Sequence, residues 1–395
     1  MKTRFTLFTF LLLCLTGLNA QTGFLGGSVV PFKPQSPLFG KDIVIQDISD
    51  RDQRNIAICS AFNGWLYAAY SYSQPDQGYI SVLRSVDNGI NWNFIGGGSA
   101  TILGNRLIKN LGILACGNSE TNLKLFIGWE YVDTLYSWSG AYLCRYNPEP
   151  FSVEGKLFSD SGIKDLAFTS DNNFPASNSN PYSIGILYSK RNLYWSGTPD
   201  TIIFLSSSNG GLSIDNRRII ATTLNTFQKV SLKYGRSPSW SSGRCFVTWE
   251  EKETDSSSVG HIYTAHSEPD FNSPFTNPVQ LDALDPSDLN MCRNPTIACQ
   301  YNNVDNDSAN LTEVVLFEKF KPASGYYDVT GYYNLQAATT SHFRPLNIAA
   351  TANNEIQPDI SFNPYNSKFM VTYFDSTQKK LPFLTNDVNL SSPNS

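Results

Sequence analysis

The sequence predicts an all-β fold, a six-bladed β-propeller with four-stranded antiparallel blades, and three observations lead to this prediction. Helical periodicity is nearly absent from the chain. Short stretches of alternating apolar and polar residues are separated by clusters of Asn, Gly, Ser and Pro, as in strands joined by turns. A set of three such stretches recurs six times. Its second stretch ends near an aromatic residue, and these aromatics are 59, 59, 61, 68 and 56 residues apart, at Tyr70, Trp129, Tyr188, Trp249, Phe317 and Tyr373.

Each repeat begins with a stretch whose first residue is basic or polar. These first stretches are RNIAI from Arg54, KNLGI from Lys109, KDLAF from Lys164, RSPSW from Arg236, RNPTI from Arg293 and QPDISF from Gln357. The second stretches are LYAAYS, LFIGWE, IGILYS, CFVTWE, VVLFEK and FMVTYFD, and the third are GYISVLRS, GAYLCRYN, TIIFLSSS, GHIYTAHS, YYDVTGYYN and KLPFLTND. A weaker fourth stretch, such as KLFSD or RRIIAT, follows most of them. Such units bury their faces by stacking on their neighbours, as propeller blades do.

The repeats predict the domain organisation. Residues 21–395 are expected to form one propeller, with blades at about 50–105, 106–160, 161–225, 226–285, 286–350 and 351–395. The sixth unit lacks a clear fourth stretch, and the earlier stretch KDIVIQDI at 41–48 could supply its outer strand.

The first twenty residues have the composition of a secretory signal peptide. MKTR is a positive start, an apolar stretch follows, and Ala20 is a small residue at the expected cleavage point. No other apolar stretch is long enough to span a membrane. We therefore expect a secreted or cell-surface protein without a membrane span.

Composition limits the partners. The net charge is −5 and only 16% of residues are charged, which argues against nucleic acid. A polar, aromatic-rich surface favours a glycan or protein ligand, and we expect a monomer. Six cysteines follow the signal segment, so disulfides could form in an oxidising compartment, with fifteen pairings open. No cofactor and no transition metal are expected, and NNVDNDSAN at 302–310 is a weak calcium motif because the EF-hand spacing is missing.

The stretch SVDNGINW at 85–92 is a turn motif. Asp87 can accept backbone N–H groups, Gly89 permits the turn, Ser85 ties it to the strand end, and Trp92 can cover the hairpin. A degenerate copy, SSNGGLSI, contains Ser207, Asn209 and Gly211. The pattern resembles the Asp-box of the sialidase-like and BNR-repeat propellers, and with the sixfold strand pattern the resemblance covers nearly the whole mature chain. The start at Gln21 after Ala20 also resembles secreted Bacteroidetes proteins.

The resemblance implies a set of site residues. In the family three arginines hold the substrate carboxylate, a tyrosine paired with a glutamate is the nucleophile, and an aspartate is the general acid. The matching positions here are Arg54, Arg236 and Arg293 for the arginines, Tyr326 or Tyr327 for the nucleophile, and Asp76 for the acid.

Several residues depart from the family pattern. Ile56 replaces the proline of the family's arginine motif, and no glutamate partner for the tyrosine is evident. Lys109 and Lys164 occupy the same repeat position as the arginines, which favours a basic strand start with no role in catalysis. The acidic residues that follow the second-stretch aromatics recur in several repeats, which favours a structural role.

Three functions remain open, and whether the protein is an enzyme is undecided. The favoured hypothesis is a non-catalytic module that binds a glycan or protein. The alternative is an exo-acting glycoside hydrolase of sialidase type, using the arginine cluster and a tyrosine nucleophile. The third is a scaffold or adhesin fragment that lacks a C-terminal sorting domain. Fold alone does not choose among them.

Overall fold

The computed structural model describes the chain from residue 52 to residue 386, with gaps. The described ranges are 52–74, 77–99, 106–133, 139–171, 182–191, 198–236, 243–268, 270–284, 291–300, 311–335, 342–349, 351–363, 368–380 and 383–386. The predicted signal peptide 1–20, the stretch 41–48, Asp76 and the stretch 302–310 lie outside them.

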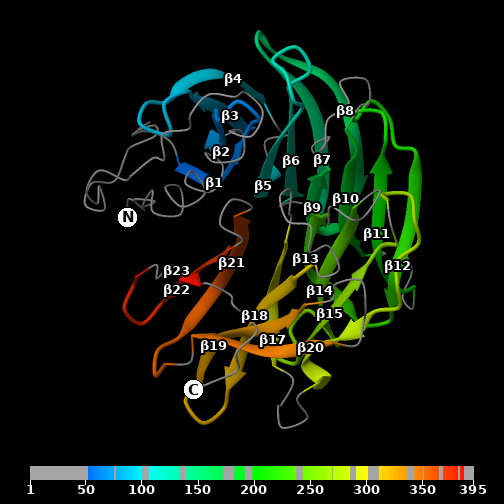
Figure 1. Ribbon diagram of the computed structural model, residues 1–395, viewed down its shortest axis with the longest axis vertical. Helices are drawn as coiled ribbons and strands as arrows, with labels where there is room; N and C mark the ends of the chain where they lie inside the picture. The colour runs from blue at the N-terminus through cyan, green and yellow to red at the C-terminus, as the bar shows by residue number, and fades with distance from the viewer. Residues whose placement is uncertain are drawn as a thin grey trace. The chain divides into compact units, whose positions relative to one another are not determined.

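Six antiparallel sheets make up the described chain (Figure 1). The first is β1 (Asp52–Ser60), β2 (Leu66–Gln74), β3 (Gln77–Ser85) and β4 (Asn93–Ser99), and the second is β5 (Arg106–Cys116), β6 (Lys124–Asp133), β7 (Ser139–Pro148) and β8 (Phe151–Ser161). The third is β9 (Ile163–Ser170), β10 (Ile184–Lys190), β11 (Asp200–Ser207) and β12 (Asn216–Thr223). The fourth is β13 (Thr226–Gly235), β14 (Arg244–Lys252), β15 (Gly260–His266) and β16 (Val279–Gln280), followed by the 3-10 helix η1 (Asp282–Leu284). The fifth is β17 (Cys292–Cys299), β18 (Glu313–Lys321), β19 (Tyr326–Asn334) and β20 (Phe343–Ala349), and the sixth is β21 (Glu355–Asn363), β22 (Lys368–Asp375) and β23 (Phe383–Asn386).

This architecture confirms the predicted fold class, an all-β six-bladed propeller with antiparallel blades. The sixth sheet has three strands within the described residues. The stretch 41–48, which was expected to supply its outer strand, lies outside them, so that part stays a prediction. The chain divides into two compact units, residues 1–137 with 143–156, and residues 138–142 with 157–395. The predicted domain and blade boundaries stay a prediction.

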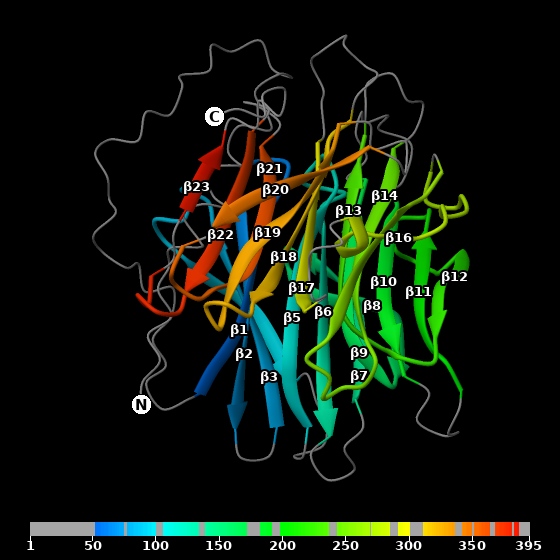
Figure 2. The ribbon, with the colours of Figure 1, turned by 90° about the horizontal axis from the view of Figure 1, so that it is seen from below.

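The first strands of neighbouring sheets lie side by side within each unit. In the second unit β9, β13, β17 and β21 are neighbours in that order, and in the first unit β1 is next to β5 (Figures 1 and 2). First strands carry a β-bulge, seen as a break in pairing register between Arg54 and Ile56, Ile108 and Asn110, Phe227 and Val230, Arg293 and Thr296, and Ile356 and Asp359. A bulge removes a backbone group from the ladder, so another partner must satisfy it.

In the second unit a carboxylate of the preceding sheet supplies that partner. The backbone N–H of Asn294 donates to Glu250 at 3.0 Å, and that of Gln357 donates to Glu318 at 2.8 Å. Both donors have positive φ, at 52° and 55°. Asp165 plays the same part by accepting the N–H of Val230 at 2.7 Å. The acidic residues that recur in the sequence therefore include two that tie one sheet to the next.

Aromatic and branched side chains fill the space between sheets. One cluster joins β10 and β11 to β13 and β14, and it includes Phe204, Phe227 and Trp249. Trp249 is 1% exposed and lies 5.8 Å from the ring of Tyr263 in a stacked arrangement. Trp249 is thus a packing residue.

The turn 85–92 has the hydrogen bonds that the sequence motif predicts. The Ser85 hydroxyl accepts the N–H of Gly89 at 2.8 Å, Asp87 accepts the N–H of Asn91 at 2.8 Å, and the indole N–H of Trp92 donates to the Gly89 carbonyl at 3.0 Å. Gly89 has φ 85°, which only glycine adopts readily. Membership of the Asp-box family stays a prediction.

The degenerate copy has the same arrangement. The hydroxyl of Ser207 accepts the N–H of Gly211 at 3.1 Å, and Oδ1 of Asn209 accepts the N–H groups of Leu212 and Ser213 at 3.0 and 3.1 Å. An amide oxygen therefore replaces the carboxylate.

The six described cysteines are all thiols, so none of the fifteen pairings is present in this part of the chain. Burial raises the pKa of Cys245 and Cys299 well above the ordinary value, which makes these thiols unreactive. Within the ranges given above, no helix is long and apolar enough to cross a membrane.

Candidate functional site

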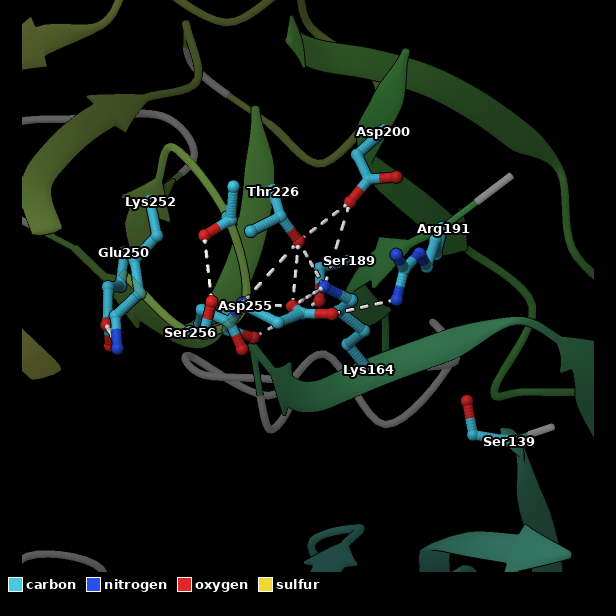
Figure 3. Close-up of polar contacts among 12 residues, drawn as sticks. Ser139, Lys164, Ser189, Arg191, Asp200, Thr226, Glu250, Lys252, Asp255 and Ser256 are labelled. Carbon is cyan, nitrogen blue, oxygen red and sulfur yellow. Dashed lines mark hydrogen bonds and ion pairs between the residues drawn. The ribbon is translucent and has the colours of Figure 1, made fainter. Parts of the chain in front are cut away.

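Lys164 is the centre of a group of charged and polar side chains at the start of the first strands of the third and fourth sheets (Figure 3). Its ammonium group lies 2.5 Å from a carboxylate oxygen of Asp255 and 3.9 Å from one of Asp200, and it also donates to the hydroxyl of Thr226. The Lys164 side chain is 14% exposed, so its charge depends on these partners. The bulge of β9 occurs at this position, between the residues paired with Ser189 and Lys190.

Asp255 lies in the turn between β14 and β15 and contacts three more side chains. Arg191, directly after β10, donates to it at 2.8 Å and Gln228 donates to it at 2.7 Å. The Thr226 hydroxyl lies 3.2 Å from Asp255 and 3.1 Å from Asp200, and its single hydrogen can be donated to only one of them. Partial burial acts to raise the pKa of Asp255, but the hydrogen bonds from Lys164 and Gln228 and the charges of Lys164 and Arg191 hold that pKa well below its usual value. Asp255 is therefore ionised at all physiological pH values.

We call Lys164, Arg191, Asp200, Thr226, Gln228 and Asp255 the charged cluster. It has two layers. Asp200, at the start of β11, is buried beneath and is bonded to the Thr226 hydroxyl at 3.1 Å. Asp255 and Arg191 lie above, each with nearly half of the side chain exposed. The buried layer fixes the exposed layer in place.

The exposed layer presents a carboxylate beside a guanidinium group. A carboxylate has about four acceptor positions, and Lys164, Gln228 and Arg191 donate to three of those of Asp255. A guanidinium has five N–H donors, so the pair keeps an acceptor and several donors that match the hydroxyl groups of a sugar. Within the described residues no group of three or more His, Cys, Asp or Glu side chains could hold a metal ion.

The structure brings together two of the residues predicted from the family resemblance. The guanidinium of Arg293, on β17, lies 3.8 Å above the ring of Tyr327, on β19. Its Nε donates to Glu318 at 2.6 Å. Glu318 is fully buried and also accepts from Asn294 at 2.7 Å. A glutamate thus lies near the tyrosine, although none was identified from the sequence as its partner.

Arg236 does not occupy the position expected from the repeat. It follows the last residue of β13, whereas Arg293 is the second residue of β17. A Cβ on Gly235 would be 2.9 Å from the Cβ of Cys299, which places this end of β13 beside the last residue of β17. Six residues of extended strand separate Arg293 from that point, or about 20 Å. Arg293 lies directly before the bulge of β17, and the residue directly before the bulge of β13 is Phe227.

The other predicted residues are dispersed or outside the described chain. Arg54 is on β1, with its backbone paired to Ser71, and its side chain is not described. Tyr326 begins β19 and is 40% exposed. Asp76 lies outside the described residues.

Sequence reasoning assigned no function to the members of the charged cluster. Lys164 was noted as part of the repeat, but its partners come from four other segments. One signal could have located them: each lies at a strand start or in a turn at the end of the sheet where first strands begin. Binding residues are concentrated in such loops.

Comparison with known proteins relates the chain to glycoside hydrolases by fold alone. No protein-family model matches, and no curated protein matches. An α-L-arabinofuranosidase of Fusarium graminearum, solved with an iminosugar inhibitor, has a TM-score of 0.52 and 9% identity over 85% of this chain and 93% of that one. An α-L-arabinanase of Penicillium chrysogenum, solved with arabinobiose, has a TM-score of 0.51 and 13% identity over 86% and 95%. A sialidase of Streptococcus pneumoniae has a TM-score of 0.48 and 9% identity over 85% and 67%. The chain has the propeller fold of the two fungal structures.

Proposed function

We propose that this protein is a secreted or cell-surface propeller that binds a glycan without turnover, and that the charged cluster contacts the ligand. The observation that carries the proposal is the pairing of exposed Asp255 and Arg191 above a buried layer of Lys164 and Asp200. Such a rigid pair supplies acceptors and donors for adjacent hydroxyls at little cost in side-chain entropy. The two fungal structures, solved with sugar ligands, support a glycan over a protein ligand.

The electrostatics favour binding over hydrolysis. A glycoside hydrolase needs one carboxylic acid that stays protonated near neutral pH, together with one carboxylate. In the charged cluster the pKa of Asp255 is lowered, and Asp200 lies within 3.9 Å of the Lys164 ammonium group. Asp255 is therefore not suited to donate a proton.

Binding to a glycan array, followed by isothermal titration with the best ligand, tests the proposal. Asp255→Ala and Arg191→Ala should each weaken binding about tenfold, because each removes charge-assisted hydrogen bonds. Glu253→Ala is the matched control, since Glu253 is exposed in the same turn and lies outside the charged cluster. Equal affinity of wild type, Asp255→Ala and Arg191→Ala would reject the charged cluster as the binding site.

A second candidate function is an exo-acting glycoside hydrolase of sialidase type. The observation in its favour is the contact of Arg293, Tyr327 and Glu318, which are residue types that this chemistry uses. The position of Arg236 counts against it, because a three-arginine clamp cannot form from opposite strand ends.

Fluorophore release from an aryl sialoside and an aryl arabinofuranoside separates the two functions. Hydrolysis predicts turnover that Tyr327→Phe and Arg293→Ala abolish and that the control Tyr326→Phe retains. Binding without turnover predicts no release by any variant, with folding confirmed by circular dichroism.

A further inference from the structure

A cavity that shares no lining residue with the charged cluster lies on one face of the fifth sheet. Its volume is about 240 Å³. Its floor comes from β18, β19 and β20, which lie side by side in Figure 2. Phe317 pairs with Thr330 and Thr330 with Asn347, so these three side chains form one row on the same face. Tyr332 lies in the next row, and the segment with η1 closes the cavity.

The walls combine an apolar surface with a few fixed polar groups. The rings of Phe317 and Tyr332 are stacked, with centroids 6.2 Å apart and planes at 22°. Asp282 is 3% exposed, and its carboxylate is held by the N–H of Ile262 at 2.9 Å and by His261 at 2.8 Å. Such a wall suits a ligand with one apolar face and several hydroxyls.

The cavity lining also contains hydrogen-bond donors. Lys319 and Asn347 line the same cavity as Asp282. The hydroxyl of Thr330 lies 3.0 Å from the carbonyl of Leu346 and 3.1 Å from Oδ1 of Asn347, and it can donate to one of them. The amide of Asn347 also has two N–H groups that can donate to a ligand. The lining contains one ammonium group and one carboxylate, so its net charge is zero. This balance disfavours an anionic or a cationic ligand, because either would face a like charge in a confined space.

We infer that this cavity is a binding site for one neutral sugar residue, separate from the charged cluster. Its volume is below the range of pockets for drug-sized ligands, about 300–1,000 Å³, and matches a single ring. The ring's apolar face would lie against Tyr332, and its hydroxyls would bond to Asp282, Lys319 and Asn347. A ligand of this size binds with a Kd of about 1–10 mM.

Saturation-transfer NMR with the methyl glycosides of L-arabinose, D-galactose and D-glucose tests the inference on the full chain, with D-glucuronate and D-glucosamine as charged comparisons. Asn347 is exposed, so Asn347→Phe should fold and fill the opening of the cavity. It should weaken binding at least tenfold, and Lys319→Met should weaken it about fivefold. Arg344→Ala is the matched control, because Arg344 is exposed on the same strand but alternates to the other face.

The expected result is transfer to at least one neutral glycoside that Asn347→Phe abolishes and that Arg344→Ala and Asp255→Ala retain. Three results would overturn the inference: no transfer to any neutral glycoside, transfer that survives Asn347→Phe, or tighter binding of a charged sugar. Asp255→Ala changes the charged cluster, whereas Asn347→Phe changes the cavity. Loss of ligand binding at the charged cluster can therefore be distinguished from loss of sugar binding in the cavity.

Discussion

Glu313 is a buried acid whose protonation should control the stability of the second unit. It begins β18, is 1% exposed, and one of its oxygens has no hydrogen-bond partner. The other oxygen is 2.9 Å from the hydroxyl of Thr264, which is also 2.9 Å from the carbonyl of Val247. A hydroxyl has one hydrogen, so it can donate to only one of these oxygens. A protonated Glu313 satisfies both contacts, because it donates to Thr264 while Thr264 donates to Val247.

Burial raises the pKa of Glu313 from 4.5 to about 8, against a smaller lowering by the Thr264 hydrogen bond. The folded state therefore binds this proton more tightly than the unfolded state. Stability is fully present below the unfolded pKa and is lost as pH rises from 4.5 to about 8. At about 1.36 kcal/mol per pKa unit, this one group lowers the free energy of unfolding by about 2.5 kcal/mol between pH 5 and pH 7.

Glu313→Gln removes the titration and keeps the shape of the side chain. Urea unfolding of wild type and variant, followed by tryptophan fluorescence at pH 5 and pH 7, measures the free-energy difference. Between pH 5 and pH 7 the unfolding free energy of the variant should rise by about 2.5 kcal/mol relative to that of wild type. This change is expected whatever the difference in unfolding free energy between the two proteins at pH 5. Glu253→Gln, an exposed carboxylate, should follow the wild type. Parallel pH profiles of wild type and Glu313→Gln would refute a neutral buried acid.

Substitutions at three further positions test the fold. Asn209→Ala should cost about 1–2 kcal/mol in unfolding free energy because two backbone donors lose their acceptor, whereas Asn209→Asp should stay within about 0.5 kcal/mol; thermal unfolding distinguishes them. Gly331→Ala should cost about 3 kcal/mol or more, since its Cβ would be 2.0 Å from the carbonyl oxygen of Val315, and a well-expressed variant with wild-type melting would contradict this. Glu318→Ala should cost about 3 kcal/mol, measured by urea unfolding, because a buried acceptor of three hydrogen bonds is lost; a change below about 1 kcal/mol would disprove its role between sheets.

Alternating hydrophobicity was enough to predict the sheets. The second strands were found because their aromatics, such as Trp249 and Phe317, fill the space between sheets and so recur once per blade. Position along the first strands was harder, because a bulge shifts the alternation by one residue without changing composition. Separately, the repeat alignment put Arg236 level with Arg293, although Arg236 follows the last residue of β13 and Arg293 lies directly before the bulge of β17.

The candidate site could not be predicted for a different reason. Lys164, Asp200 and Asp255 are separated by 36 and 55 residues in the sequence. They meet because neighbouring first strands, a strand start and a turn share one end of their sheets. Sequence periodicity predicts which residues face the interior of a sheet. It does not predict which turn of one sheet lies within hydrogen-bond distance of a neighbouring sheet.

Two backbone amide protons in the bulges of the first strands allow the separation of neighbouring sheets to be measured. The amide protons of Asn294 and Gln357 are bonded to carboxylates of the preceding sheet and take no part in their own ladders. Their hydrogen-exchange rates therefore report the opening between two blades, while the exchange of ladder amides reports the fraying of a single blade. Two residues per molecule can thus show whether neighbouring blades part before either one unfolds.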